Sequence, residues 1–66
     1  MKAGMLLRLN KRLFKNTDRR WLIKKEGQLI RNEKTIKGYK VAPVESLDKE
    51  FWVSEEQLHH RFEEAV

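Results

Sequence analysis

The chain has 66 residues, of which 39% are hydrophobic and 38% are charged, with a formal net charge of +5 and no cysteine. This length allows one small domain with a thin core, residues 1–66, and the lack of cysteine excludes disulfides and thiolate metal sites. Because its apolar runs are short, such as Met5–Leu7, the sequence excludes a membrane-spanning helix and predicts a soluble, cytoplasmic protein without membrane contact.

The first predicted element covers residues 5–13, and its apolar pattern fits two structures. Every second residue from Met5 to Leu9 is apolar, as in a strand, but the same segment also carries a helical stripe. We favour the strand, because the elements that follow need sheet partners. If residues 5–13 and 18–26 are instead helices, with a hairpin wing at residues 28–41, the chain is similar to a winged helix.

The next predicted element is a β-hairpin. Residues 20–25 and 28–31 read as two short strands around the Glu-Gly dipeptide at positions 26–27, where glycine supplies a positive φ. This register sets Ile23 opposite Ile30 and gives the hairpin an apolar face.

A further strand is predicted at residues 35–42. Gly38 inside it indicates a bulge or bend, and Pro43 ends it before a polar connection over residues 44–50. One face of this strand carries Thr35, Lys37, Tyr39 and Val41.

The C-terminal part reads as a short apolar strand at residues 51–53 that runs into a helix at residues 54–65. Ser54 is the predicted N-cap, and Gln57 three residues later completes a capping box. A narrow apolar stripe along the helix consists of Leu58, Phe62 and Ala65.

Together these elements predict an α+β domain. Its sheet, within residues 4–53, is a strongly bent antiparallel sheet of four or five strands near an SH3-like barrel, closed by the C-terminal helix. The predicted core consists of Leu7, Leu9, Trp21, Ile23, Ile30, Val41, Phe51, Val53, Leu58 and Phe62.

The layout resembles small SH3-like or KOW-type β-barrels: strand hairpins, Gly38-Tyr39 in a late strand, and Phe51–Val53 leading into a capped helix. Such domains are common in translation and transcription factors and in phage or plasmid accessory proteins. The resemblance implies binding of RNA, DNA or protein through loops and an open sheet face.

Residues 38–43, followed by Val53 and a helix, are also similar to the end of the carbon storage regulator family, which are small dimeric RNA-binding β-proteins. In that family an arginine precedes the acidic pair at the helix entry and contacts RNA. Ser54 occupies that position here and the preceding loop is longer, so no residue role is carried over.

Charge is divided unevenly along the chain. Residues 1–40 hold 13 Lys or Arg and three acids, whereas residues 41–66 hold two bases and seven acids. Such asymmetry is typical of contact with polyanions such as nucleic acid. The alternative is that the acidic segment folds back on the basic body and neutralises its charge. The two interpretations are compatible if the acidic segment covers only one face of the basic body.

The basic residues therefore predict a non-catalytic RNA- or DNA-binding surface formed by a basic loop and a sheet face. Trp52 lies on the opposite side of its strand from Phe51 and Val53, so it is a candidate for base stacking, as is Tyr39. Core packing is the alternative for both rings. The full set of candidate nucleic-acid-binding residues is Arg12, Lys15, Arg19, Arg20, Lys24, Lys25, Lys37, Tyr39 and Trp52.

Catalysis and metal binding find little support in the sequence. Its three glycines are isolated, and no G-x-S-x-G or phosphate-binding loop is present, so we expect no enzyme, cofactor or metal. His59 and His60 are adjacent, and neighbouring helix residues point about 100° apart, so they do not chelate one ion. A protein-interaction module or inhibitor that binds an acidic partner surface is the alternative function, and the thin core leaves a homodimer open.

Overall fold

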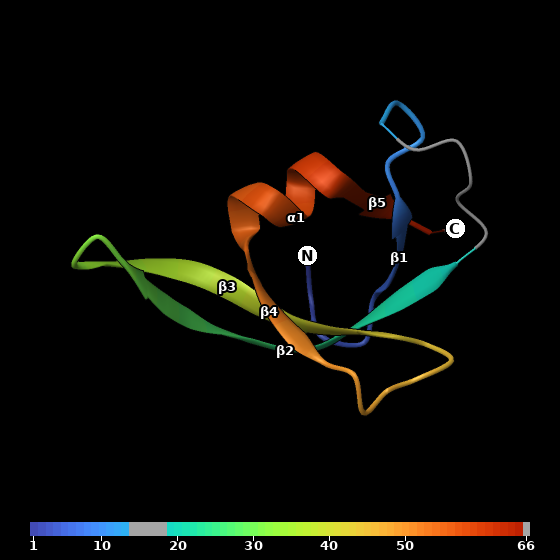
Figure 1. Ribbon diagram of the computed structural model, residues 1–66, viewed down its shortest axis with the longest axis horizontal. Helices are drawn as coiled ribbons and strands as arrows, with labels where there is room; N and C mark the ends of the chain where they lie inside the picture. Colours follow the sequence, from blue (N-terminus) through green and yellow to red (C-terminus); the bar gives the residue numbers. More distant parts are fainter. Residues whose placement is uncertain (14–18, 66) are drawn as a thin grey trace.

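The computed structural model describes residues 1–13 and 19–65, which form a five-stranded antiparallel sheet and one short helix (Figure 1). In chain order the elements are β1 (Leu6–Leu9), β2 (Arg20–Arg31), β3 (Lys34–Pro43), β4 (Phe51–Ser54), α1 (Glu55–Arg61) and β5 (Phe62–Glu64). The predicted α+β class is confirmed. Since both β1 and β2 are strands, the winged-helix alternative is wrong.

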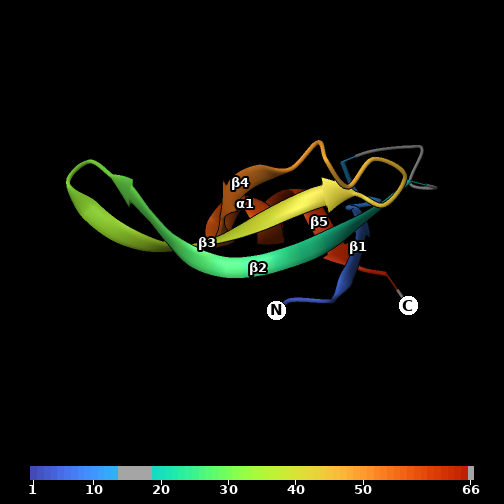
Figure 2. The ribbon, with the colours of Figure 1, turned by 90° about the horizontal axis from the view of Figure 1, so that it is seen from below.

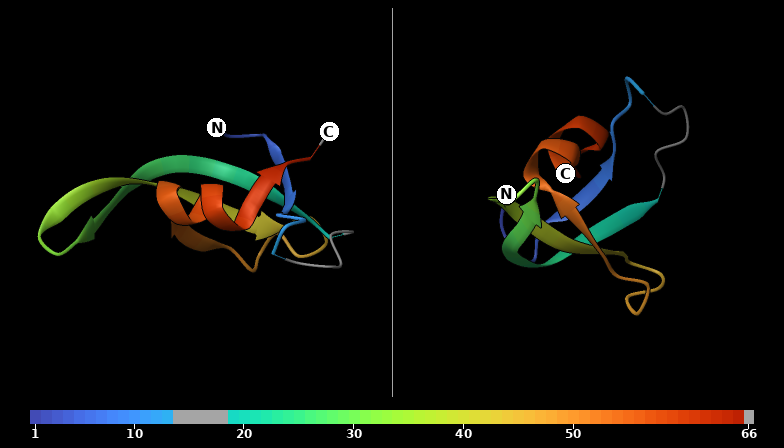
Figure 3. Two further views of the ribbon diagram at one scale, coloured as in Figure 1. Left: turned by 90° about the horizontal axis from the view of Figure 1, so that it is seen from above. Right: turned by 60° about the vertical axis from the view of Figure 1, so that its left-hand side comes forward.

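The sheet is strongly bent but open, so the expected closure into a barrel is wrong. Its strand order is β4-β3-β2-β1-β5, which leaves β4 and β5 at opposite edges. The helix α1 connects these two edges across the concave side of the sheet (Figures 1 and 3). It contacts β3, β4 and β5 and fully buries Leu58. The helix thus covers the apolar face that a closed barrel would have enclosed.

The strand β2 is continuous for 12 residues, so the loop expected at positions 26–27 is wrong. The chain turns instead at Asn32 and Glu33, and β2 pairs with β3 from Trp21↔Pro43 to Arg31↔Lys34. Both turn residues have positive φ, 50° at Asn32 and 63° at Glu33. Two successive positive φ values define the turn type whose twist matches a β-hairpin.

A β-bulge at Lys24 interrupts the ladder between β2 and β3, where the register shifts between Ile23 and Lys25. The bulge changes which residues of β2 face the core: Ile23 pairs with Val41 and is buried, whereas Lys25 pairs with Lys40 on the outer face. The N-terminal segment supports this point, because Gly4 N–H donates to the Ile23 carbonyl at 2.8 Å and Ile23 N–H donates to that of Met5 at 3.0 Å. Sequence reasoning placed the irregularity at Gly38 instead.

The core lies between the bent sheet and α1. It confirms seven of the ten predicted residues and adds Tyr39, which is fully buried, while Leu9 packs against the cluster from a half-buried position. The Trp21 and Phe62 rings meet edge-to-face with centroids 5.3 Å apart. The seven confirmed residues are Leu7, Trp21, Ile23, Val41, Val53, Leu58 and Phe62.

Two predicted core residues are wrong. Ile30 is 81% exposed, because it pairs with Thr35 in the part of the hairpin that extends beyond α1 (Figures 1 and 2). Phe51 is 44% exposed, since it begins the edge strand β4 at the end away from the helix (Figure 1). Both side chains lie on the core side of the sheet, but beyond the area that α1 covers.

The helix begins as predicted and ends early. Ser54 is the N-cap, and its hydroxyl accepts a hydrogen bond from Gln57 N–H at 3.2 Å. Helix α1 stops at Arg61, four residues before the predicted end, and Phe62–Glu64 instead pairs with β1 as β5. Pairing with β5 satisfies the backbone groups along the outer edge of β1, which would lack a neighbouring strand if the helix continued to Ala65.

The hairpin turn gives a first testable prediction. Glu33 holds a left-handed φ of 63°, which costs a residue with a side chain about 1 kcal/mol, whereas glycine adopts it freely. We expect Glu33→Gly to raise the free energy of unfolding by about 0.5 kcal/mol, because part of the gain is offset by the entropy of an unfolded glycine. Urea unfolding measures the difference. Thr35→Gly, in extended strand nearby, is the matched control and should destabilise the chain.

Candidate nucleic-acid interface

Acidic residues from the C-terminal part fold back on the basic body, which was the alternative interpretation of the uneven charge distribution. Glu45 pairs with Arg19, and Glu63 pairs with Arg8 at 3.2 Å. Within residues 1–13 and 19–65, four of the seven acids after position 40 make such contacts with bases of the first 40 residues: Glu45, Glu50, Glu55 and Glu63. A surface that binds a polyanion would therefore be formed by the other bases of the first 40 residues.

The strand register places a series of bases on the outer face of the sheet, opposite α1. In an antiparallel pair, directly opposed residues share a face, and so do alternate residues of one strand. The outer face therefore carries Arg8, Arg20, Lys25, Arg31, Lys34 and Lys40, with Trp52 beside them on β4. Within residues 1–13 and 19–65, Lys25, Arg31 and Lys34 make no ion pair.

Trp52 lies on this face, on the edge strand β4, and is 40% exposed. A Cβ atom built on Gly27 would lie 2.7 Å from Cη2 and 2.9 Å from Cζ3 of its indole, so the ring reaches across β3 to rest on the bare backbone of β2. The Nζ atoms of Lys25 and Lys40 each lie 5.6 Å from the ring centroid. These are cation–π distances, so the one ring contacts both ammonium groups at the surface.

The two lysines are directly opposed in the ladder between β2 and β3. Like charges in that position are destabilising, so the pair needs compensation. The Trp52 ring supplies part of it, and the Glu50 carboxylate supplies the rest by accepting from Lys40 Nζ at 3.0 Å. Lys24, extruded at the bulge, also donates to Glu50 at 2.5 Å. We call Lys24, Lys25, Lys40, Glu50 and Trp52 the Trp52 cluster.

Glu50 is an internal anion in this cluster. Hydrogen bonds from Lys24, and then from Lys40, hold the pKa of its carboxyl below the ordinary value of 4.5. It therefore stays charged at neutral pH and occupies two of the three ammonium groups, and a phosphate oxygen would accept from the same donors.

The predicted site residues divide into two groups along β2. Lys24, Lys25 and Trp52 come together in the Trp52 cluster, joined there by Lys40, which the candidate set lacked. Arg12, Arg19 and Arg20 lie at the other end, beside the β1–β2 connection. The Arg19 guanidinium packs 5.7 Å from the Trp21 ring centroid and also pairs with Glu45. Lys15 lies outside the described residues.

Tyr39 and Lys37 lie on the inner face. Tyr39 is fully buried and donates from its hydroxyl to Glu55 at 3.1 Å, so its ring is enclosed by the core and offers no stacking surface. Lys37 contacts Glu26 at 3.3 Å and Glu55 at 3.9 Å. The Tyr39 hydroxyl first, and Glu26 second, raise the pKa of Lys37 above its ordinary value.

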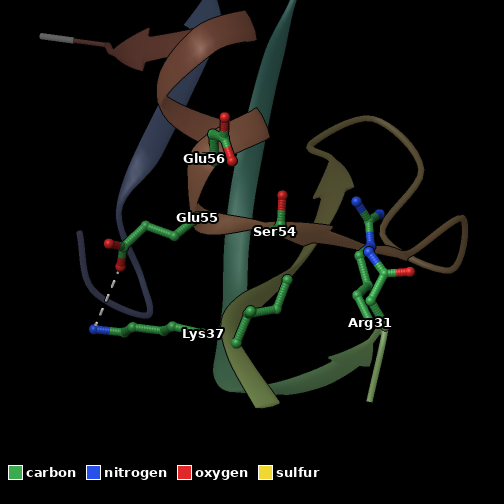
Figure 4. Close-up of a pocket in the computed structure, with 7 residues that line it drawn as sticks. Arg31, Lys37, Ser54, Glu55 and Glu56 are labelled. Carbon is green, nitrogen blue, oxygen red and sulfur yellow. Dashed lines mark ion pairs between the residues drawn. The ribbon is translucent and has the colours of Figure 1, made fainter. Parts of the chain in front are cut away.

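A shallow cleft of about 540 Å³ lies where the β3 edge passes the start of α1. Figure 4 shows Lys37 and Glu55 paired on one side of it and Arg31 on the other. Its full lining is Arg31, Asn32, Ile36, Lys37, Ser54, Glu55 and Glu56. Because both signs of charge line it and its lysine is already paired, the cleft offers no concentrated binding charge.

Sequence reasoning missed Lys40, Glu50 and Gly27 as parts of the site. Gly27 was assigned to a turn, whereas it is the platform for Trp52. Only the true register reveals this, because Lys40 reaches Trp52 through the pairing of β3 with β4 and reaches Lys25 through the bulge. No local motif in the sequence carries that information.

Comparisons with protein-family models, curated proteins and solved structures gave no match for this chain. None of the helical residues described in the structure forms a segment with the length and apolar character needed to cross a membrane. Across the described ranges, His, Asp and Glu side chains form no group of three suited to a metal ion.

The lowered pKa of Glu50 gives a pH prediction. A carboxyl whose pKa falls on folding stabilises the folded state above its ordinary pKa, 4.5 here, and this stabilisation is lost as the pH falls through the lowered value. We expect wild-type protein to unfold at higher urea than Glu50→Gln at pH 7, and the two midpoints to converge toward pH 3. A difference that stays constant from pH 7 to pH 3 would contradict this role.

Proposed function

We propose that this chain is a non-catalytic nucleic-acid-binding domain that uses its outer sheet face. The observation that carries the proposal is the Trp52 cluster, where two opposed lysines and an exposed indole gather on one open surface. A folded protein gains no stability from opposing Lys25 to Lys40, whereas a polyanion would relieve their repulsion. Arg31 and Lys34 extend the positive charge along the same face.

The proposal includes a relation to the small SH3-like domains, in an open form. The support is the layout itself: antiparallel hairpins, Gly38-Tyr39 inside β3, and Phe51–Val53 running into a helix capped by Ser54. Such a layout presents an open sheet face, and the bases of this chain are placed on that face.

The first test is a fluorescence titration of the two tryptophans with single-stranded RNA, single-stranded DNA and duplex DNA at two salt concentrations. Phosphate contacts release counterions, so affinity should fall steeply with salt. In Lys25→Ser/Lys40→Ser the slope of log affinity against log salt should decrease by about two units, one for each phosphate contact. Lys49→Ser, an exposed lysine on the β3–β4 connection, is the matched control and should behave as wild type.

A second variant tests the internal anion. Glu50 occupies Lys24 and Lys40, so its neutralisation should free both for phosphate. We expect Glu50→Gln to bind a given oligonucleotide more tightly than wild type at the same salt, and Glu64→Gln, an exposed acid of β5 at the opposite edge of the sheet from β4, to have a smaller effect. Equal affinities of wild type and Glu50→Gln would contradict competition at this carboxylate.

A protein partner is the second candidate, favoured by apolar side chains around the β3–β4 connection. Val44, Leu47 and Phe51 are 47%, 44% and 44% exposed. If no nucleic acid changes the fluorescence at low salt, this surface becomes the better candidate. Sedimentation at several protein concentrations would then distinguish a homodimer from a contact with another protein.

A further inference from the structure

The hairpin formed by β2 and β3 extends past the rest of the molecule as a two-stranded arm, residues 28–37 (Figures 1 and 2). It begins after the Gly27↔Gly38 pair, where Gly38 is also opposite Ser54, the last residue of β4. β1 pairs with β2 only at its other end, from Arg20 to Leu22. The arm is therefore a regular ladder of four residue pairs with both outer edges free of neighbouring strands.

The side chains of the arm do not serve the core. Ile30 is 81% exposed, the highest value among the exposed large hydrophobic residues of the described chain. Arg31 and Lys34, at the last pair before the turn, are exposed and make no ion pair with a described acid. Leu29 lies against Gly38, Ile36 is half-buried, and Lys37 pairs with Glu26 and Glu55. A charged ribbon with an exposed isoleucine fits a role in contact with a partner.

The dimensions of the arm favour one partner. In undeformed B-form DNA a two-stranded ribbon fits the major groove, which is about 12 Å wide, whereas the minor groove, which is about 6 Å wide, would have to be widened at a cost in deformation energy. Four residues per strand at about 3.3 Å each give the arm a reach of about 13 Å, more than the groove depth of about 8.5 Å. The major groove of duplex RNA is too deep and narrow for side chains to read.

The chemistry of the arm fits the same groove. Arginine binds guanine O6 and N7, asparagine and glutamine bind adenine N6 and N7, and isoleucine or threonine can contact the thymine methyl group. Residues of these types on the arm, all exposed, are Gln28, Ile30, Arg31, Asn32 and Thr35. Lys25, at the base of the arm, lies where it can contact the phosphates beside the groove.

We propose that residues 28–37 insert into the major groove of duplex DNA, with Arg31 and Ile30 contacting base edges and the Trp52 cluster contacting the flanking phosphates. This inference rests on the proposed function and narrows its ligand from nucleic acid in general to B-form DNA.

The test combines affinity with chemical protection. Wild-type protein is titrated with a 20-base-pair duplex and with each of its single strands, and the duplex complex is treated with dimethyl sulfate, which methylates guanine N7 in the major groove and adenine N3 in the minor groove. We expect tighter binding to duplex than to either strand, with protection of guanine N7. Arg31→Ser and Ile30→Ser should each weaken duplex binding about tenfold and reduce that protection.

Two controls distinguish a lost DNA contact from a loss of folding or of general positive charge. Both replaced side chains are exposed, so thermal melting should show the two variants folded, and Lys49→Ser should leave duplex affinity within twofold of wild type. Equal or tighter binding to single strands, protection of adenine N3 alone, or arm variants that bind duplex as wild type does would each overturn the arm inference while leaving the proposed function standing. Absence of binding to any nucleic acid at low salt would overturn both.

Discussion

The antiparallel ladder between β2 and β3 is the constraint on which the rest of this structure depends. It runs from Trp21↔Pro43 to Arg31↔Lys34 and is interrupted once, by the bulge at Lys24. Because side chains alternate along a strand, the bulge reverses the facing of every later residue of β2. Before it, Trp21 and Ile23 face the core; after it, odd-numbered residues face outward. One inserted residue therefore decides both the core and the composition of the outer face.

This dependence explains how much of the fold could be read from the sequence. Local signals succeeded where short-range chemistry decides the structure, as at the Ser54 cap and the Phe51–Val53 strand. They failed at the hairpin, because the Glu-Gly dipeptide at positions 26–27 has the glycine that a tight turn favours, whereas the actual turn at Asn32-Glu33 has none. The cost of a left-handed φ at Glu33 is small beside the ladder that the later turn allows, so non-local pairing overrides the local preference.

The candidate site depends on the same strand register. Sequence patterning placed Trp52 on the opposite side of its strand from Phe51 and Val53 and identified the first 40 residues as basic, and the register confirms that Trp52 faces away from Val53. The sequence pattern did not identify which lysines are opposed in the sheet. Lys25 and Lys40 are 15 positions apart, and they are paired only because the bulge shifts the register of β2 against β3. Nor could the pattern tell Tyr39 from Trp52, since aromatic residues of both kinds suit a core or a surface. Coverage by α1 makes the difference: the helix encloses Tyr39 and lies on the opposite side from Trp52.

The two glycines opposed in the ladder show what the outer face is built to hold. Gly27 admits the Trp52 indole, and Gly38 admits the Leu29 side chain, so each backbone gap is filled from a neighbouring position. Glycine weakens a strand interior, and two opposed glycines weaken it twice. In return the indole lies close against the sheet, within cation–π distance of Lys25 and Lys40, while Glu50 accepts a hydrogen bond from Lys40.

The Gly27↔Gly38 pair, which weakens the ladder, lies at the junction between the body of the sheet and the arm. The Trp52 cluster adjoins the exposed ribbon at this junction. A polyanion bound at that junction could replace Glu50 at the lysines while remaining within reach of Arg31 and Lys34, and this joins the two basic parts of the outer face into one surface.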